Sequence, residues 1–375
     1  MDRIFIESTR LLLSVAPLVF NNSIFAMKGG TAINLFIQDM PRLSVDIDIV
    51  YLRAEDDWKQ SLESIRNEFL LIAERVKQLG ISARPSGNLE SPKLFLENAD
   101  IQVKIEINTV FRGTILPVEH RRLSQNAADM FGLDITVPTL QPDELYAGKL
   151  VAALDRQHPR DLFDVMHLFR TSDLTDRMIE CFVIYLAGHN RPIHEVLFSN
   201  DKDVSELFKG SFAGMTQNET SLDVLLSARA RLREELLPRL SLAHRQFLYD
   251  MTKGTPDWAL LKYPHVGNYP ALRWKLLNLE KFKANRPEEF ANQANKLQAH
   301  FSALKVAESN PGSEPAFGQR LRTKSIATLR PVDSMTGLRS GLDRLLAPYD
   351  RIKPQEMQPQ REQEPEPDSD PDFSM

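Results

Sequence analysis

Cysteine is almost absent from this chain of 375 residues, which contains a single one, Cys181. One cysteine allows no disulfide within the chain and no zinc site built from several thiolates. Cys181 lies in an apolar run, residues 181–185, so we expect a buried and unreactive thiol. This composition fits a reducing compartment such as the cytoplasm.

Long apolar stretches and an excess of positive charge are also missing. No segment reaches the roughly 18 to 20 continuous apolar residues of a membrane span, and residues 11–20 lack the basic flank and cleavage site of a signal peptide. The 46 Lys and Arg against 51 Asp and Glu give a net charge of −5, which does not indicate nucleic-acid binding. We expect a cytoplasmic protein without a membrane segment, long enough for two domains.

The first third of the chain alternates strand and helix patterns. Residues 43–50 and 101–108 alternate apolar and polar side chains, which predicts two strands. Residues 58–79 repeat apolar side chains every three or four positions, which predicts a long amphipathic helix. Shorter helices are expected at 11–20 and 32–37. The pattern predicts an α+β domain over residues 1–137, with a mixed β-sheet flanked by helices.

Helical patterns take over after residue 138. Pro142 and Pro159 are suited to the first turns of two helices. Further helices are expected at 225–236 and 272–283. We predict a helical domain over residues 138–308, followed by a tail, 309–375, that is rich in Pro, Ser and charge and mostly disordered.

A glycine pair follows the first strand-like segment, at Lys28-Gly29-Gly30-Thr31. Glycines at the start of a helix let the backbone approach a phosphate closely, with amide groups turned toward the anion. A glycine pair alone is weak evidence. Its value here comes from the acidic strand that follows.

Asp46 and Asp48 stand two residues apart on the predicted strand 43–50. Their carboxylates therefore leave the same face, about 6.5 to 7 Å apart. Two hard oxygen ligands so placed can bind magnesium together with triphosphate oxygens. Glu106 on the second predicted strand is the candidate third carboxylate. The alternatives are a solvated strand face for the aspartates and, for Glu106, exposure to solvent or pairing with Lys104 or Arg112.

These residues resemble a known family. Lys28 to Ala32 followed by Arg42 to Asp48 is similar to the AbiEii/AbiGii nucleotidyltransferase toxins, which are related to the MenT toxins and belong to the DNA polymerase β-like nucleotidyltransferase superfamily. The segments 144–149, 156–164 and 270–279 resemble later motifs of the family in the right order. The resemblance covers about residues 20 to 285. One departure is Glu106, where many members of the superfamily have aspartate.

The resemblance implies an enzyme that moves a nucleoside monophosphate from a nucleoside triphosphate to an acceptor, the 3′ end of tRNA, with Mg²⁺ or Mn²⁺ as cofactor. It implies the toxin of a type IV-like toxin–antitoxin or phage-defence system, with an antitoxin encoded nearby. The implied catalytic residues are Asp46, Asp48, Lys149 and Asp164. The implied metal ligands are Asp46, Asp48 and Glu106. The implied nucleotide-binding residues are Lys28, Gly29, Gly30, Thr31, Arg42, Ser44 and Arg156.

The residues of the predicted helical domain allow the same interpretation on physical grounds. Lys149 and Arg156 are seven apart on one helical face and could hold triphosphate oxygens, or simply form a solvated face. Asp161 and Asp164 are three apart on the next helix, and Asp164 is the better candidate for a catalytic aspartate. Asp161 could instead occupy the first helical turn or pair with Arg160. Arg42 and Ser44 could equally make local hydrogen bonds at the start of the strand.

Two other functions stay open. A protein-modifying nucleotidyl or phosphoryl transferase could use the same fold on a protein side chain, and a degenerate member could bind nucleotide or a partner without catalysis. Arginines at 229, 231, 233, 239 and 245 could contact a nucleic-acid backbone, although a solvated surface is the more frequent explanation. Trp274 and Tyr263 are expected in core or interdomain packing, and not as platforms on which bases stack.

Overall fold

A computed structural model of the protein describes residues 1–309 except 23, 87–90 and 100. The predicted disordered tail therefore lies outside the described residues, apart from Ser309. The described strands form one sheet of seven strands in the order β3-β4-β5-β2-β1-β7-β6. They are β1 Phe25–Lys28, β2 Asp46–Tyr51, β3 Ser82–Pro85, β4 Lys93–Asn98, β5 Ile101–Ile107, β6 Glu119–Arg122 and β7 Thr136–Thr139.

The sheet is mixed, as the sequence predicts. β1 runs antiparallel to β2, while β2 is parallel to β5 and β1 is parallel to β7. The strand over residues 43–50 begins at Asp46 in the structure, and the strand over 101–108 ends at Ile107. The sequence patterns did not identify β3, β4, β6 or β7. Three of these have only four residues, too few for an alternating pattern to stand out.

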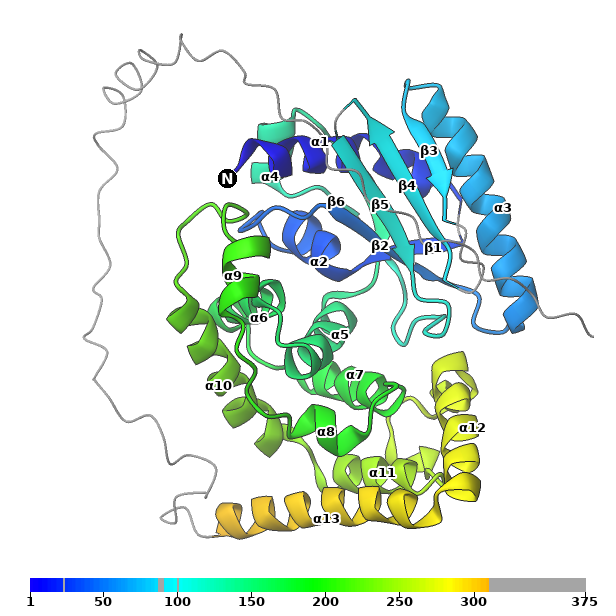
Figure 1. Ribbon diagram of the computed structural model, residues 1–375, viewed down its shortest axis with the longest axis vertical. Helices are drawn as coiled ribbons and strands as arrows, with labels where there is room; N and C mark the ends of the chain where they lie inside the picture. Colours follow the sequence, from blue (N-terminus) through cyan, green and yellow to red (C-terminus); the bar gives the residue numbers. More distant parts are fainter. Residues whose placement is uncertain (23, 87–90, 100, 310–375) are drawn as a thin grey trace, which may run out of the picture. The chain divides into compact units, whose positions relative to one another are not determined.

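One face of the sheet is covered by two helices, α1 Arg3–Val19 and α3 Trp58–Lys77 (Figure 1). Phe25 of β1 packs against Phe69 of α3, with 6.2 Å between ring centroids. Ile47 and Ile49 on β2 are fully buried. Because side chains alternate along a strand, Asp46 and Asp48 point to the opposite face. The core thus fixes which face of the sheet carries the acids.

The other regular elements of the described chain are helices and helical turns. α5 Pro142–Asp155 and α6 Pro159–Thr171 both begin at the predicted prolines. The helices predicted at 225–236 and 272–283 are longer in the structure. The remaining elements are α2 Gly29–Ala32, a π-helical turn Ile33–Ile37, α4 Gln125–Phe131, α7 Asp176–Ala187, α8 Ile193–Leu197, α9 Ser205–Ser211, α10 Leu222–Arg239, α11 Leu242–Thr252, two 3-10 turns Trp258–Leu260 and Pro264–Asn268, α12 Pro270–Asn285 and α13 Pro287–Ser309.

In the part of the chain that the structure describes, no helix has the length and apolar character needed to cross a membrane. Cys181 lies on α7 and is fully buried, as expected, and burial raises the pKa of its thiol.

Candidate active site

The glycine turn connects β1 to α2 and lies directly beside the acidic strand. Gly29 has φ +76°, a left-handed conformation that favours glycine, and a Cβ added there would stand 2.1 Å from Oδ2 of Asp48. A Cβ on Gly30 would stand 2.7 Å from Nη2 of Arg42. The two glycines therefore give room to a carboxylate on one side and a guanidinium on the other. The structure brings Lys28-Gly29-Gly30 and Asp48 together, as the sequence suggests.

The three predicted metal ligands occupy neighbouring strands. Asp48 on β2 is opposite Glu106 on β5 and, across the other edge of β2, opposite Lys28 on β1. Asp46 stands opposite Lys104. Residues in register on adjacent strands project to the same face, so the three carboxylates share one face with two lysines.

The partners of these acids differ. Asp48 accepts no hydrogen bond and forms no ion pair with any residue that the structure describes. Burial raises the pKa of its carboxyl, and Lys28 and Lys149 oppose that shift. Asp46 has one distant ion pair, 3.9 Å from Nζ of Lys104. Two acids of β2 are thus left largely without protein partners.

Glu106 is already paired. Its Oε1 lies 2.5 Å from Nζ of Lys93 and 3.3 Å from Nζ of Lys104. Although burial alone would raise the pKa of Glu106, these lysines hold it below its usual value. Of the partners foreseen for this residue, Lys104 is found and Arg112 is not. Lys93 was missed because it lies on β4, a strand that the sequence patterns did not identify.

A pocket of about 430 Å³ opens at this face of the sheet. Its lining is Lys28, Asp48, Ser91, Lys93, Glu106, Ile107, Asn108 and Thr109. Burial lowers the pKa of Lys28, although Asp48 opposes this shift. The pocket therefore contains both oxygen ligands for a hard cation and ammonium groups for an anion.

The donor set suits a divalent metal bound together with a phosphate. In residues 1–309, with 23, 87–90 and 100 left out, no three acidic, histidine or cysteine side chains converge closely enough to hold an ion by themselves. Asp48 is nevertheless held against the Gly29 backbone without a partner, and Asp46 is nearly as free. Magnesium keeps several non-protein ligands and is often bound by one or two carboxylates plus substrate phosphates. Asp46 and Asp48 fit that arrangement.

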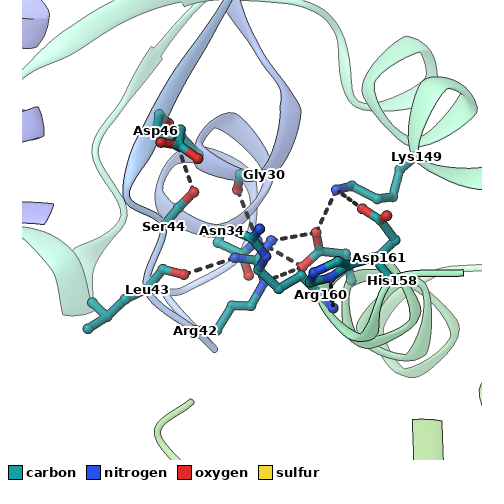
Figure 2. Close-up of polar contacts among 12 residues, drawn as sticks. Gly30, Asn34, Arg42, Leu43, Ser44, Asp46, Lys149, His158, Arg160 and Asp161 are labelled. Carbon is teal, nitrogen blue, oxygen red and sulfur yellow. Dashed lines mark hydrogen bonds and ion pairs between the residues drawn. The ribbon is translucent and has the colours of Figure 1, made fainter. Parts of the chain in front are cut away.

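A second group of charges is buried next to the first. Arg42 donates two hydrogen bonds of 2.7 Å to the two oxygens of Asp164, and both residues are nearly inaccessible to solvent. Lys149 lies 2.9 Å from Asp164 and 2.9 Å from Asp161 (Figure 2). Asn34 donates a further hydrogen bond to Asp164 at 2.9 Å. Although burial alone would raise the pKa of Asp164, Arg42 and Lys149 hold it below its usual range. We call Arg42, Lys149, Asp161 and Asp164 the buried ion cluster.

Arg156 joins this cluster from outside. Its guanidinium is hydrogen-bonded to Asp161, its side chain is 63% exposed, and the bond raises its pKa. Asp161 is in the first turn of α6, as foreseen, but its partners are Lys149 and Arg156 instead of Arg160. His158 caps α6 by accepting the N–H of Arg160 on Nδ1, consistent with a loop histidine.

Thr31 and Ser44 make hydrogen bonds within the protein that support the site in this structure. The Thr31 hydroxyl lies 2.8 Å from Oγ of Ser44 and also contacts the carbonyl oxygen of Asp46. Thr31 is fully buried and Ser44 nearly so. These contacts join α2 to the start of β2 and thereby fix the height at which Asp46 leaves the sheet.

Two expectations for the helical part are corrected or clarified. Trp274 is 54% exposed, so the prediction of core or interdomain packing is wrong for this residue. Tyr263 is partly buried against the core. The arginines of α10 are engaged with acids; the pairs are Arg229 and Arg233 with Asp201, Arg231 with Glu235 and Arg239 with Asp176. That helix forms a paired surface.

The chain is similar to one known protein family and to a solved structure. A family model described as nucleotidyl transferase AbiEii toxin, type IV TA system, matches residues 10–278. No curated protein matches. Among solved structures, the chain is similar to MenT4, the nucleotidyltransferase toxin Rv2826c from Mycobacterium tuberculosis H37Rv, with 17% sequence identity and a TM-score of 0.47. That alignment covers 78% of this chain and 92% of the other.

Proposed function

Because the chain belongs to the nucleotidyl transferase AbiEii toxin family of type IV toxin–antitoxin systems and is a nucleotidyltransferase, we propose that it transfers a nucleoside monophosphate to the 3′ end of tRNA. The acceptor hydroxyl attacks the α-phosphorus of a nucleoside triphosphate, the bond to the β-phosphate oxygen breaks, and pyrophosphate leaves with the electron pair. The hydroxyl proton passes to a base or to water.

The observation that carries this proposal is the pair of nearly unpartnered aspartates beside a glycine turn. Asp46 and Asp48 would hold Mg²⁺ or Mn²⁺. Glu106 would be a third carboxylate when Lys93 and Lys104, which now pair with it, bind phosphate oxygens instead. A divalent cation at this place neutralises charge on the triphosphate oxygens. Gly29 and Gly30 let the backbone approach those oxygens, and Lys28 faces the same pocket.

The buried ion cluster supports a division of roles among the remaining residues. Lys149 lies near Asp48 and would face the triphosphate, held in place by Asp161 and Asp164. Both oxygens of Asp164 are engaged, which supports a positioning role in place of direct contact with the acceptor hydroxyl. Arg156 is the exposed member and would bind phosphate from the rim.

Three residues assigned to the nucleotide from sequence have internal partners. Thr31, Ser44 and Arg42 hold the turn, the strand and α6 together. We propose that they act on the nucleotide through that frame. The boundary between a nucleotidyltransferase domain, 1–137, and a helical domain, 138–308, remains part of this proposal.

The test is a labelling experiment with each α-labelled nucleoside triphosphate, total RNA and total protein in the same reaction. We expect label in tRNA, dependent on added Mg²⁺ or Mn²⁺ and abolished by a chelator. Label that enters only protein would exclude the tRNA acceptor and establish the protein-modifying alternative. Digestion of the labelled RNA from its 3′ end shows whether the nucleotide is terminal.

The biological consequence follows from the chemistry. A blocked tRNA 3′ end stops translation, so we propose that the chain arrests growth in the cytoplasm until an antitoxin encoded nearby opposes it. Such arrest during infection would serve as phage defence. Co-expression of the neighbouring gene with this chain tests the antitoxin, since restored growth is the expected result.

A further inference from the structure

The outer face of α12 leaves a tryptophan in water. The helix buries Ala271, Leu272 and Leu279, whereas Trp274 is 54% and Leu277 51% exposed. Residues three apart lie on one helical face, so the two exposed side chains form one apolar surface. Exposed apolar surface of this kind often marks a place where a partner binds.

Positive charge surrounds this surface. Arg273 and Lys281 are exposed, and neither forms an ion pair with any residue in the described part of the chain. Lys283 lies over the ring of Phe290 at 5.9 Å. Glu280 is the single acid of the helix. In a chain with a net charge of −5, α12 is thus a local basic surface.

The comparison with α10 shows that the basic residues of another helix are held by acids. The arginines of α10 are paired with Asp201, Glu235 and Asp176. Ion-paired arginines offer less to a phosphate, because a ligand must first displace an acid. Arg273 and Lys281 on α12 are available without that competition.

The start of α12 is anchored to the segment that leaves the candidate active site. The hydroxyl of Tyr269, the residue before α12, donates to the carbonyl oxygen of Thr114. Asn108 and Thr109, at the beginning of the same loop, line the pocket with Asp48 and Glu106. A molecule bound along α12 therefore lies on an element connected directly to the pocket wall.

We propose that the face of α12 formed by Arg273, Trp274, Leu277 and Lys281 binds unpaired RNA. One base stacks on Trp274, and Arg273 and Lys281 hold neighbouring phosphates. Stacking on an aromatic side chain combined with basic groups is how proteins bind single-stranded nucleic acid without sequence preference. A protein partner is the rival, but unpaired cations around one tryptophan favour a polyanion. The inference rests on the proposed function, because it concerns the RNA acceptor.

The first test measures stacking. We expect Trp274→Ala to weaken binding of a labelled hairpin RNA with an unpaired 3′ tail by about tenfold in fluorescence anisotropy. The matched control is Leu242→Ala on α11, since Leu242 is 69% exposed and lies on another helix. Nucleoside triphosphate affinity, measured by equilibrium dialysis, should be the same in both variants and the wild type. Unchanged RNA affinity in Trp274→Ala overturns the proposal.

The second test measures the phosphate contacts. Arg273→Ala combined with Lys281→Ala should reduce the slope of log K against log salt concentration by about 1.4, the value for two contacts to single-stranded RNA. The control combines Arg231→Ala with Arg239→Ala on α10, where both arginines are ion-paired. Equal slopes in the wild type and the α12 variant contradict the proposal.

Two outcomes separate this inference from the proposed function. If the wild type labels RNA and Trp274→Ala does so with unchanged KM, the α12 surface is overturned while the acceptor stands. If the wild type labels only protein, the acceptor fails and the α12 proposal fails with it. Loss of antitoxin binding in Trp274→Ala with full RNA affinity would assign the surface to a protein and also overturn the proposal.

Discussion

Asp48 on β2 and Asp164 on α6 are both aspartates close to Lys149, yet their surroundings differ. Asp164 receives hydrogen bonds from Arg42 and Asn34, and the cations hold its pKa below the usual range. Asp48 has no hydrogen-bond partner among the described residues, and burial raises its pKa. The difference suggests that the saturated carboxylate builds the frame, whereas the unpartnered one is kept for a ligand from outside.

Removing Asp48 gives the largest expected effect. We predict that Asp48→Ala lowers nucleotide transfer by at least about 10³-fold, because the charge on the triphosphate loses a metal ligand. The free energy of unfolding should stay the same or rise, since a buried carboxylate without partners does not stabilise the fold. Transfer of an α-labelled nucleotide and urea denaturation measure the two quantities. The control is Asp134→Asn, an exposed aspartate paired with Arg122.

The Asp48 variant also separates an enzyme from a degenerate binding module. Growth arrest that persists with folded Asp48→Ala would mean that catalysis is not the cause of toxicity. Asp48 would then serve binding and not catalysis.

Breaking the buried ion cluster should affect stability. Arg42→Ala leaves Asp164 with Lys149 and Asn34 but without its two strongest hydrogen bonds, so we expect a loss of about 3 to 5 kcal/mol in the free energy of unfolding. Arg122→Ala, which removes the exposed pair with Asp134, should leave the free energy of unfolding nearly unchanged, because solvent screens that pair. Denaturant titrations of both variants give the comparison.

A paired apolar replacement refines the prediction for the cluster. Arg42→Met with Asp164→Leu removes both charges and should recover part of the lost stability. Transfer activity should stay low, because Lys149 loses one of the carboxylates that hold it. Full activity in the double variant would contradict the positioning role of Asp164.

Glu144 on α5 provides an intermediate case between the two aspartates. Its carboxylate is buried and accepts the N–H groups of Ile115 and Leu116 at 2.9 Å each and the hydroxyl of Tyr185 at 3.1 Å. Burial outweighs these bonds and raises the pKa of Glu144 to about 7. The folded state therefore binds the proton more tightly than the unfolded state. Its stabilising contribution is complete below about pH 4.5 and is lost as pH rises to about 7.

This single group should change the free energy of unfolding by about 3 kcal/mol between pH 4.5 and pH 7. Glu144→Gln should remove that pH dependence while it retains a carbonyl acceptor for one of the two backbone N–H groups. Urea denaturation of wild type and variant at intervals from pH 4.5 to 8 measures the difference. Parallel curves for the two proteins would show that Glu144 does not titrate in this range.

The smallest expected effect comes from replacing glycines. A comparison of Gly29→Ala with Gly80→Ala separates the cost of the left-handed backbone from the cost of a clash with Asp48. Gly29 and Gly80 have φ +76° and +73°, but a Cβ meets Asp48 only at Gly29, and at Gly80 it meets nothing within 4 Å. Gly80→Ala should therefore cost about 1 to 2 kcal/mol from the left-handed conformation alone. Gly29→Ala should cost more and should weaken Mn²⁺ binding, measured by electron paramagnetic resonance, which Gly80→Ala leaves unchanged. Equal losses and equal metal binding would show that Asp48 is not seated on Gly29.

The chain's periodic patterns predicted the elements that position the acids. Alternation identified β2 and β5, and the three-and-four spacing of apolar residues identified α3, because the core covers one face of each. The sequence patterns did not identify β4, whose Lys93 pairs with Glu106. The strand predicted at residues 101–108 did not by itself show which segment pairs with it. The alternation of strand and helix patterns predicted the mixed sheet, and the motifs predicted the family.

Which carboxylate has partners could not be predicted. Asp48 and Asp164 are both flanked by apolar residues in the sequence, and nothing local distinguishes them. Their difference arises from side chains far away in the chain, such as Arg42, which lies 122 residues from Asp164. Trp274 was wrongly expected to be buried because a tryptophan in a helix with apolar neighbours is usually covered.

That long separation has a consequence for synthesis. β2 is synthesised early, but the carboxylate that pairs with Arg42 is available only when α6 has emerged from the ribosome. Met27 of β1 likewise pairs with Thr139 only after β7 has been synthesised. A nascent or prematurely ended chain thus carries the reactive acids without their scaffold. The cell that makes this protein meets a working toxin only after α6, which ends at Thr171, has left the ribosome.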